Sequence, residues 1–384
     1  MKQYNYPTTI LFGEGALQEA AKRISLKYKR PLIVTDKILL ELGIVKPFEE
    51  LLVQHGLSPV VFSEVHSNPI EQDVNLGAEA FLKNQCDLLI GFGGGSPMDV
   101  AKVIAVRASQ EGPLAQFDDA KGGDALMDGS KIPPNVAIPT TAGTGSEVGR
   151  AGVITVDETG LKTIIFHPKL MPEMAVLAPE LTTGLPAQVT AATGLDAFTH
   201  CLEAYFAPGF HPMADGIAFE GMRLVLQNLT QVYKKGEDYE ARGKMLMAAS
   251  MGATAFQKGL GMIHAIAHPL SSECGLHHGL ANALMLPYCV EFLENKDLNA
   301  DQRGRIKKVK DLFHECGLIT KETLAQTCKV YFESLGIKFG LRHHNVRDDQ
   351  FEILGYKAFL DVSHQTNMIP VSEADLKAVI EKAF

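Results

Sequence analysis

The chain has 384 residues, a length that favours two domains over a single core. Hydrophobic residues make up 46% and charged residues 21%, which is ordinary for a globular protein. The formal net charge of -9 disfavours a nucleic-acid partner, because neutralising phosphates requires a basic face. No apolar run approaches the length of a membrane span, and residues 1–7 carry no apolar signal core. We therefore expect a soluble, cytoplasmic protein with no membrane and no nucleic-acid partner.

The cysteines point to the same compartment. There are six, and none forms a C-x-x-C pair: Cys86, Cys201, Cys274, Cys289, Cys316 and Cys328. Scattered thiols in a long chain are typical of reduced cysteines in a cytosolic protein.

Short apolar runs alternate with helix-like stretches in the first part of the chain. The strand candidates are 31–35, 59–62, 88–92 and 136–138, and helical patterns such as 16–26 and 74–84 lie between them. Strands that alternate with helices predict a parallel sheet covered by helices on both faces.

The pattern changes after Pro186. Long helix-like segments dominate from there on, and strand signals almost vanish; the segments are 188–207, 212–227, 239–258 and 287–295. We place a domain boundary at residue 187, which gives an α/β domain over residues 1–187 and an all-α domain over residues 188–384.

A glycine-rich loop follows the third strand candidate. Residues 93–99 (GGGSPMD) lead into a helix expected over 96–107, with Ser96 suited to the N-cap, Pro97 to the first helical position and Asp99 to a capping box. Glycines let the backbone approach a ligand closely, and a helix N-terminus attracts anions. We interpret the loop as a cradle for the pyrophosphate of a dinucleotide; the alternative is a well-capped strand-to-helix turn.

An acidic residue for the adenosine ribose is less clearly marked. The common dinucleotide fingerprint places it about 20 residues after the glycines, whereas Asp36 precedes them, at the end of the 31–35 strand. A carboxylate there can accept a hydrogen bond from a ribose 2′-OH and repels a 2′-phosphate, which favours NAD over NADP. Taken alone, the residue favours the alternative, a turn-forming Asp.

A second polar loop, residues 139–147 (PTTAGTGSE), follows the strand candidate at 136–138. Small hydroxyl residues and glycines offer donors to diphosphate and ribose oxygens without bulk. Alone, the loop is equally typical of a Ser/Thr-rich turn. Two such loops at the ends of strands favour a nucleotide-binding crevice.

Histidines and one aspartate recur at helical spacing in the second half. Asp196 and His200 are four residues apart, which places them on one helix face, and so are His264 and His268 in a segment that is otherwise apolar. A polar side chain on an apolar face needs a partner. Several of them together indicate a shared partner, namely a metal ion.

The identity of the last ligand is open on spacing alone, because His277 and His278 compete for one role. One Asp with three His suits Fe(II), and also Zn(II) or Mn(II). Such a set leaves a coordination position for a substrate oxygen.

Four motifs together resemble the iron-containing (group III) alcohol dehydrogenase family. They are GGGSPMDVAK from Gly93, PTTAGTGSEV from Pro139, TGLDAFTHCLEAY from Thr193, and HAIAHPL followed by HHGLANALMLP from His264. The likeness spans nearly the whole chain. It implies an NAD-linked, metal-dependent dehydrogenase acting on a primary or small secondary alcohol or its aldehyde, and a homodimer.

The resemblance also implies roles for individual residues. The metal ligands would be Asp196, His200, His264 and His278, since the family's last ligand directly precedes a glycine. The cofactor residues would be Gly94, Gly95, Ser96 and Asp99 at the diphosphate, Thr140, Thr141 and Thr144 along the nucleotide, and Asn68 and Lys162 near the cofactor. His268 is similar to a family histidine beside the nicotinamide and is the candidate for a proton relay.

Two residues depart from the family pattern, and a third has two interpretations. Gly149 stands where Thr is common and Ala178 where Asp is common; Arg150 suits an anionic substrate or a structural role. The alternatives are a lyase or polyol dehydrogenase of the related fold, which typically lacks a histidine at the position of His200, and a non-catalytic metal- or nucleotide-binding relative.

Overall fold

The computed structural model describes residue 6 and residues 8–384, so most of the N-terminal segment in which we expect no signal core lies outside the described residues. Contacts divide the chain into two compact units. The first comprises the residues up to Thr141 and residues 145–183, and the second comprises residues 142–144 and 184–384. The domain boundary at residue 187 stays a prediction.

The first unit is built on a six-stranded parallel sheet, as the sequence predicts. In the order of the sheet, its strands are β1 (Thr9–Phe12), β8 (Met174–Leu177), β5 (Asn135–Pro139), β4 (Leu88–Gly93), β2 (Pro31–Val34) and β3 (Val60–Phe62). The four strand candidates correspond to β2, β3, β4 and β5. β1 and β8 were not anticipated.

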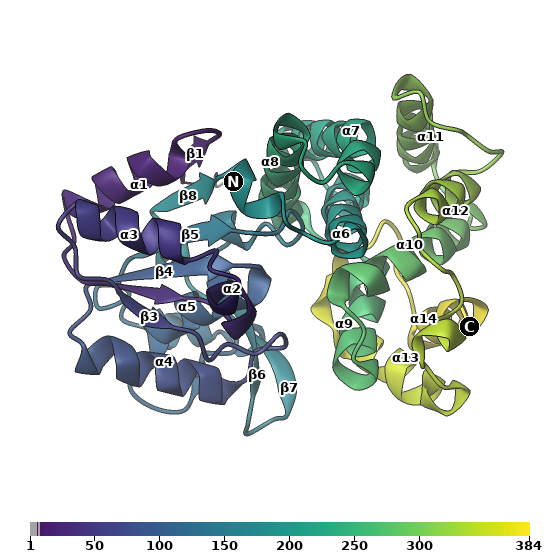
Figure 1. Cartoon of the computed structure of the whole chain (residues 1–384). Coiled ribbons are helices and arrows are strands. Elements are labelled where there is room, and N and C mark those ends of the chain that lie inside the picture. Colours follow the sequence, from purple (N-terminus) through teal and green to yellow (C-terminus); the bar gives the residue numbers. More distant parts are fainter. Residues whose placement is uncertain (1–5, 7) are drawn as a thin grey trace. The chain divides into compact units, whose positions relative to one another are not determined.

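Helices cover both faces of this sheet. They are α1 (Ala16–Ser25), α2 (Lys37–Glu41), α3 (Lys46–Gln54), α4 (Glu71–Lys83) and α5 (Gly95–Arg107). In Figure 1, α1 and α3 lie on one side of the sheet and α4 lies on the other. Ile33 of β2 packs in a core with α1 and α3, whereas its neighbours Leu32 and Val34 pack in a core with α4 and α5. Successive residues of a strand point to opposite faces, so burial on both sides explains the unbroken apolar runs.

A two-stranded antiparallel hairpin completes the first unit. It consists of β6 (Ala151–Val156) and β7 (Leu161–Phe166). Ile154, Val156 and Ile165 from the hairpin join the core formed by α4 and α5. The hairpin is therefore packed against the same face of the sheet as those helices.

The second unit is helical, and its described residues contain no strand, which confirms the predicted all-α class. Its helices are α6 (Ala187–Phe206), α7 (Pro212–Lys234), α8 (Tyr239–Ala255), α9 (Met262–Cys274), α10 (His278–Glu294), α11 (Ala300–Glu315), α12 (Leu324–Ser334), α13 (Phe351–Leu360) and α14 (Glu373–Lys382). Every residue from Thr190 to Phe206 is buried, so α6 is enclosed on all sides, as an all-round apolar helix must be.

One expected helix is present but starts at a different residue. The segment 287–295 reads as a helix that starts at Pro287, but α10 begins at His278 and Pro287 lies inside it. The missing N–H of Pro287 leaves the Ala283 carbonyl without its helical partner, a loss that the packed interior tolerates. Among the described residues, no helix has both the length and the apolar character that crossing a bilayer requires.

Candidate metal centre and cofactor site

Three helices of the second unit bring four potential ligands together. Asp196 and His200 lie one turn apart on α6, His264 lies on α9, and His278 is the first residue of α10. One ligand atom from each of the four lies within 4.8 Å of the others. His277, the N-cap residue of α10, is not part of this group. The geometry therefore favours His278 as the fourth ligand.

A glycine makes the approach of α10 to α6 possible. A Cβ at Gly279 would lie 2.4 Å from the carbonyl oxygen of Ala192 and 3.2 Å from the Cβ of Asp196. The two helices are thus in backbone contact directly beside His278. Its Nε2 atom lies 3.5 Å from Oδ1 of Asp196. The glycine that follows the histidine is needed for this close contact.

Burial and neighbouring charges shift the pKa values within the group. Burial lowers the pKa of His200 to about 4 and holds the pKa of His278 well below its ordinary value. Burial alone would raise the pKa of Asp196, but the surrounding imidazoles, His200 first, bring it below the ordinary value. Burial would lower the pKa of His264, but its hydrogen bond to Glu203 raises that pKa above the ordinary value. Metal binding requires a neutral imidazole, so a protonated His264 ring would release a proton when a divalent metal binds.

Asn282 of α10 contacts three of the four potential ligands. Its Nδ2 atom donates to Oδ1 of Asp196 at 2.7 Å and lies 3.2 Å from Nε2 of both His264 and His278. An amide NH2 offers only hydrogens, so it matches ring nitrogens that carry lone pairs. Its two hydrogens cannot serve all three acceptors at once, so these distances show only that the three ligand atoms lie close to one another.

The donor set fits a divalent metal in number and chemistry. One carboxylate and three imidazoles bind Fe(II), Zn(II) or Mn(II) well, and all four atoms are close enough to share one ion. That these residues are metal ligands stays a prediction, which this geometry supports. Sequence reasoning missed Asn282, because a single Asn in an apolar helix gives no metal-ligand pattern.

His268 makes a second, separate contact with a carboxylate. Its Nδ1 atom lies 2.6 Å from Oδ2 of Asp361. The other carboxylate oxygen, Oδ1, accepts a hydrogen bond from the Ser363 N–H and caps the short helix η10 (Val362–Thr366). Burial would raise the pKa of Asp361, but the His268 ring lowers it, to about 2. The ring of His268 is stacked on that of His278, with centroids 5.3 Å apart. Asp361 contacts Nδ1 of His268 and not Nε2. The stacking on His278 places the His268 ring beside the ligand group.

In the first unit, the segments predicted to bind a cofactor follow three adjacent strands. Thr140 follows β5, Gly94 follows β4, and Asp36 comes two residues after β2. The chain runs from β2 outward to β3 and then returns to β4 on the other side of β2. Doubly wound sheets bind ligands at the carboxyl ends of strands where the order reverses in this way.

The start of α5 differs from the expected cap. Gly94 is the N-cap and Gly95 the first helical residue, so Ser96 as the N-cap and the capping box with Asp99 are wrong. The Ser96 hydroxyl donates instead to the Ser67 carbonyl, at 2.8 Å. Gly94 provides no capping side chain, and a Cβ there would meet nothing closer than 3.6 Å. The first N–H groups of α5 therefore fit an anion such as a diphosphate.

Asp99 is held inside the first unit. Its carboxylate accepts hydrogen bonds from the Ser146 hydroxyl at 2.6 Å and from the Val153 N–H at 3.1 Å. The buried ammonium of Lys102 lies 4.0 Å away and donates to the Ser146 carbonyl. Sequence reasoning missed Lys102. The two charged residues brace the loop after β5 against the hairpin, so any role of Asp99 at a diphosphate would be to position that loop.

Three other residues predicted to bind the cofactor differ in their contacts and burial. Asp36 caps α2, with Oδ1 accepting from the Leu39 N–H at 2.9 Å. Asn68 is exposed, next to the Ser67 carbonyl that Ser96 contacts. Burial lowers the pKa of Lys162 on β7, against the attraction of Asp99.

The threonines of the second polar loop are divided between the units. Thr140 and Thr141 belong to the first unit and Thr144 to the second. Arg150, considered for an anionic substrate, lies over the ring of Phe166 at 5.5 Å. All the cofactor assignments stay predictions.

A doubly wound sheet with an open helix start, followed by a helical unit with an Asp–His group, is the arrangement that the sequence motifs predict for a metal-dependent dehydrogenase. Family comparison agrees. Residues 7–179 match the family described as iron-containing alcohol dehydrogenase, and residues 190–384 match the C-terminal domain of the Fe-containing alcohol dehydrogenase family. The chain belongs to the iron-containing alcohol dehydrogenase family and is a metal-dependent alcohol dehydrogenase, as the sequence motifs predict.

Individual relatives share its full length. The 4-hydroxybutyrate dehydrogenase of Cupriavidus necator is 38% identical over 388 residues, which cover 99% of each chain. The crystal structure of a 1,3-propanediol oxidoreductase matches with a TM-score of 0.90 at 32% identity and covers both chains completely. A sulfoacetaldehyde reductase from Bifidobacterium kashiwanohense, solved in complex with NAD+, matches with a TM-score of 0.87 at 28% identity and covers 100% of this chain and 98% of that one.

Proposed function

We propose that this dehydrogenase catalyses the reversible oxidation of a primary or small secondary alcohol to the carbonyl compound, with NAD as the hydride acceptor. The metal would be held by Asp196, His200, His264 and His278, with Fe(II) favoured by the family and Zn(II) or Mn(II) as alternatives. The observation that carries the proposal is the convergence of one ligand atom from each of the four within 4.8 Å.

The bound groups and the protein residues have different tasks. A divalent metal supplies Lewis acidity toward the alcohol oxygen, and NAD supplies the redox chemistry. The protein must still remove the hydroxyl proton. We assign this to His268, because Asp361 engages its Nδ1 and leaves Nε2 available to take a proton.

The choice of NAD over NADP rests on Asp36. Its carboxylate comes just after β2, at the reversal of strand order, where it would accept from a ribose 2′-OH and repel a 2′-phosphate. The NAD+ complex of the sulfoacetaldehyde reductase supports the same choice. The diphosphate would bind at Gly94, Gly95 and Ser96, at the open start of α5.

The names of the relatives support a short substrate. They are a dehydrogenase of 4-hydroxybutyrate, an oxidoreductase of 1,3-propanediol and a reductase of sulfoacetaldehyde, all small molecules with a second polar group. A cytoplasmic location is supported by six unpaired cysteines. A homodimer is proposed from the family resemblance.

The test is anaerobic reconstitution of the metal-free protein with Fe(II), Zn(II) or Mn(II) in parallel. NADH absorbance is then followed with a panel of short alcohols, diols, hydroxy acids and their aldehydes. We expect turnover with at least one metal, and a lower rate when NADP replaces NAD. The absence of turnover with every metal and substrate would overturn the proposal.

A further inference from the structure

A third acidic or basic side chain follows Asp196 and His200 on the same face of α6. Glu203 is one turn beyond His200 and only 4% exposed. Its Oε1 atom accepts a hydrogen bond from the Ile263 N–H at 2.7 Å, and its Oε2 atom lies 2.6 Å from Nδ1 of His264. A single buried carboxylate thus contacts both the backbone at the start of α9 and a predicted metal ligand on that helix.

We propose that Glu203 is a positioning residue that fixes which ring nitrogen of His264 faces the metal, and that it thereby sets metal affinity. The proposal rests on the metal site proposed above. An ionised carboxylate only accepts hydrogen bonds, so Nδ1 of His264 must carry the hydrogen. The neutral ring then has its lone pair on Nε2, the atom that lies 3.2 Å from Nδ2 of Asn282 and 3.9 Å from Oδ1 of Asp196.

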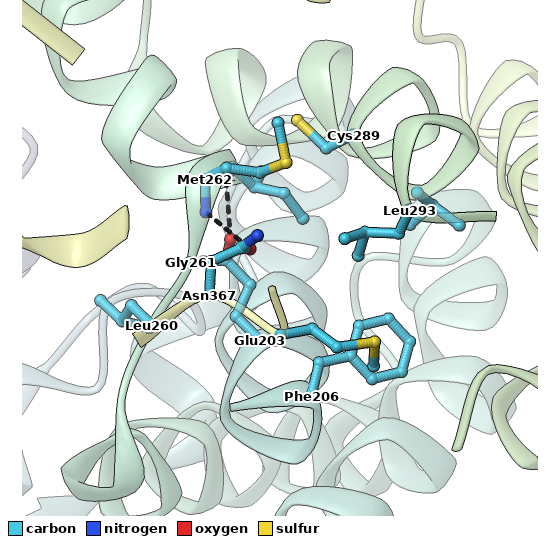
Figure 2. Close-up of a pocket in the computed structure, with 11 residues that line it drawn as sticks. Glu203, Phe206, Leu260, Gly261, Met262, Cys289, Leu293 and Asn367 are labelled. Atoms are coloured by element: carbon cyan, nitrogen blue, oxygen red, sulfur yellow. Dashed lines mark hydrogen bonds between the residues drawn. The ribbon is translucent and has the colours of Figure 1, made fainter. Parts of the chain in front are cut away.

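The surroundings hold the carboxylate in this orientation. Figure 2 shows Glu203 directed at the start of α9, beside Asn367, whose Oδ1 accepts from the Met262 N–H at 3.2 Å. A Cβ at Gly261 would lie 2.7 Å from Oε1 of Glu203 and 2.8 Å from Oδ1 of Asn367, so the glycine is needed for both acceptors to approach.

The space next to Glu203 is small. The adjoining cavity, bordered also by Phe206, Cys289 and Leu293, has a volume of about 10 Å³, about the size of one water-sized sphere (Figure 2). The carboxylate therefore has no room to turn away from the histidine. Since burying a carboxylate without partners is costly, its two hydrogen-bond donors also hold it in place.

A simpler role must be separated from this one. A carboxylate at a helix N-terminus stabilises the helix by capping and by charge, whatever it does to a histidine. Asn367 offers the matched comparison, because it caps the same first turn of α9, and its side chain bonds the Met262 N–H and the Ile369 carbonyl rather than a ligand histidine. Glu203 and Asn367 should therefore differ in their effect on metal affinity and agree in their effect on stability.

The experiment uses the full chain, stripped of metal, with Zn2+ as the probe. Zn2+ affinity is measured by competition with a chromophoric chelator, and the tautomer of His264 is read from 15N NMR of the ring nitrogens. In Glu203→Gln the single amide oxygen can accept from Ile263, which turns the NH2 group toward Nδ1 and favours a hydrogen on Nε2. We expect Zn2+ affinity to fall about 10- to 100-fold. We expect Asn367→Ala to lower the melting temperature and to leave Zn2+ affinity unchanged.

Two results would overturn the proposal: Glu203→Gln binding Zn2+ as tightly as the wild type, or Asn367→Ala losing as much affinity as Glu203→Gln. A neutral His264 ring with its hydrogen on Nε2 rather than Nδ1 in the metal-free wild-type chain would also overturn it, even if the Gln variant failed to fold. Failure of the wild-type chain to bind Zn2+, with the hydrogen on Nδ1, would instead overturn the proposed metal site and leave the orientation of His264 by Glu203 standing.

Discussion

Gly279 and Ala192 are in backbone contact, since a Cβ on the glycine would lie 2.4 Å from the alanine carbonyl oxygen. This contact holds α10 against α6 beside His278 and Asp196. We expect Gly279→Ala to destabilise the protein by about 1–3 kcal/mol, because a packed interior must shift to admit the methyl group. Metal affinity should fall with it. Urea unfolding and Zn2+ titration of the variant test both effects.

The same substitution elsewhere serves as the control. Gly216 lies on the exposed side of α7, and nothing is within 4 Å of a Cβ built there. Gly216→Ala should stabilise by roughly 0.5–1 kcal/mol, because alanine restricts the unfolded chain. Equal effects of the two substitutions would show that the contact with α6 is irrelevant.

The two histidines of α9 should behave differently on removal. His264→Ala should lose bound metal and activity together, because its Nε2 atom belongs to the ligand group. His268→Ala should retain metal and lose turnover by about 10²–10⁴-fold, the usual contribution of a positioned acid or base. Metal content by elemental analysis and NADH formation distinguish the two. Normal turnover of His268→Ala would disprove the proton relay.

The pair of Asp361 and His268 gives a prediction of pH dependence. The folded-state pKa of Asp361 is about 2, below the ordinary 3.8, so the stabilisation is complete well above pH 3.8 and is lost as the pH falls toward 2. The difference corresponds to about 2 kcal/mol while the His268 ring carries its charge, because that charge is the main cause that lowers the pKa. Asp361→Asn should therefore destabilise the protein more at pH 5 than at pH 3. An unfolding free-energy difference that is the same at both pH values would contradict this assignment.

Coenzyme preference should respond to the charge of Asp36. Asp36→Ser keeps an oxygen that can cap α2 but removes the negative charge. We expect the ratio of kcat/KM for NADP to that for NAD to rise on the order of tenfold, equivalent to about 1.4 kcal/mol. Asp36→Asn also removes the charge but keeps the size of the side chain, so it should raise the ratio as well. If neither variant changes the ratio, Asp36 does not contact the adenosine ribose.

The sequence is enough to pair Asp196 with His200 in the proposed ligand group, because one helix contains both residues. The residues that contact the ligand group are harder to predict. Glu203 continues the same face, at a spacing that could have drawn attention, but a Glu in a helix is usually solvated. Asp361 is 93 residues away from His268, so only the packing of α13 and η10 against α9 reveals their contact.

The fold shows the same division between local and distant effects. β2 and β4 are apolar runs that the sequence marks clearly. β1 is half exposed and has no clear periodicity, so its pairing with β8 depends on residues far away in the chain. Ser96 has the chemistry of an N-cap, but its hydroxyl contacts Ser67 instead. The start of α10 was misplaced because Pro287 suggests a helix beginning, whereas burial outweighs the lost hydrogen bond.

A proline also lies inside α9, at position 269. Because Pro269 has no N–H, the carbonyl of Ala265 lacks its helical partner, and the missing bond spans the turn that contains His268. The turn that contains His268 is therefore held by one main-chain hydrogen bond fewer than a turn without proline. The contact of His268 with Asp361, on a distant part of the chain, gives this turn an anchor that the helix itself does not provide.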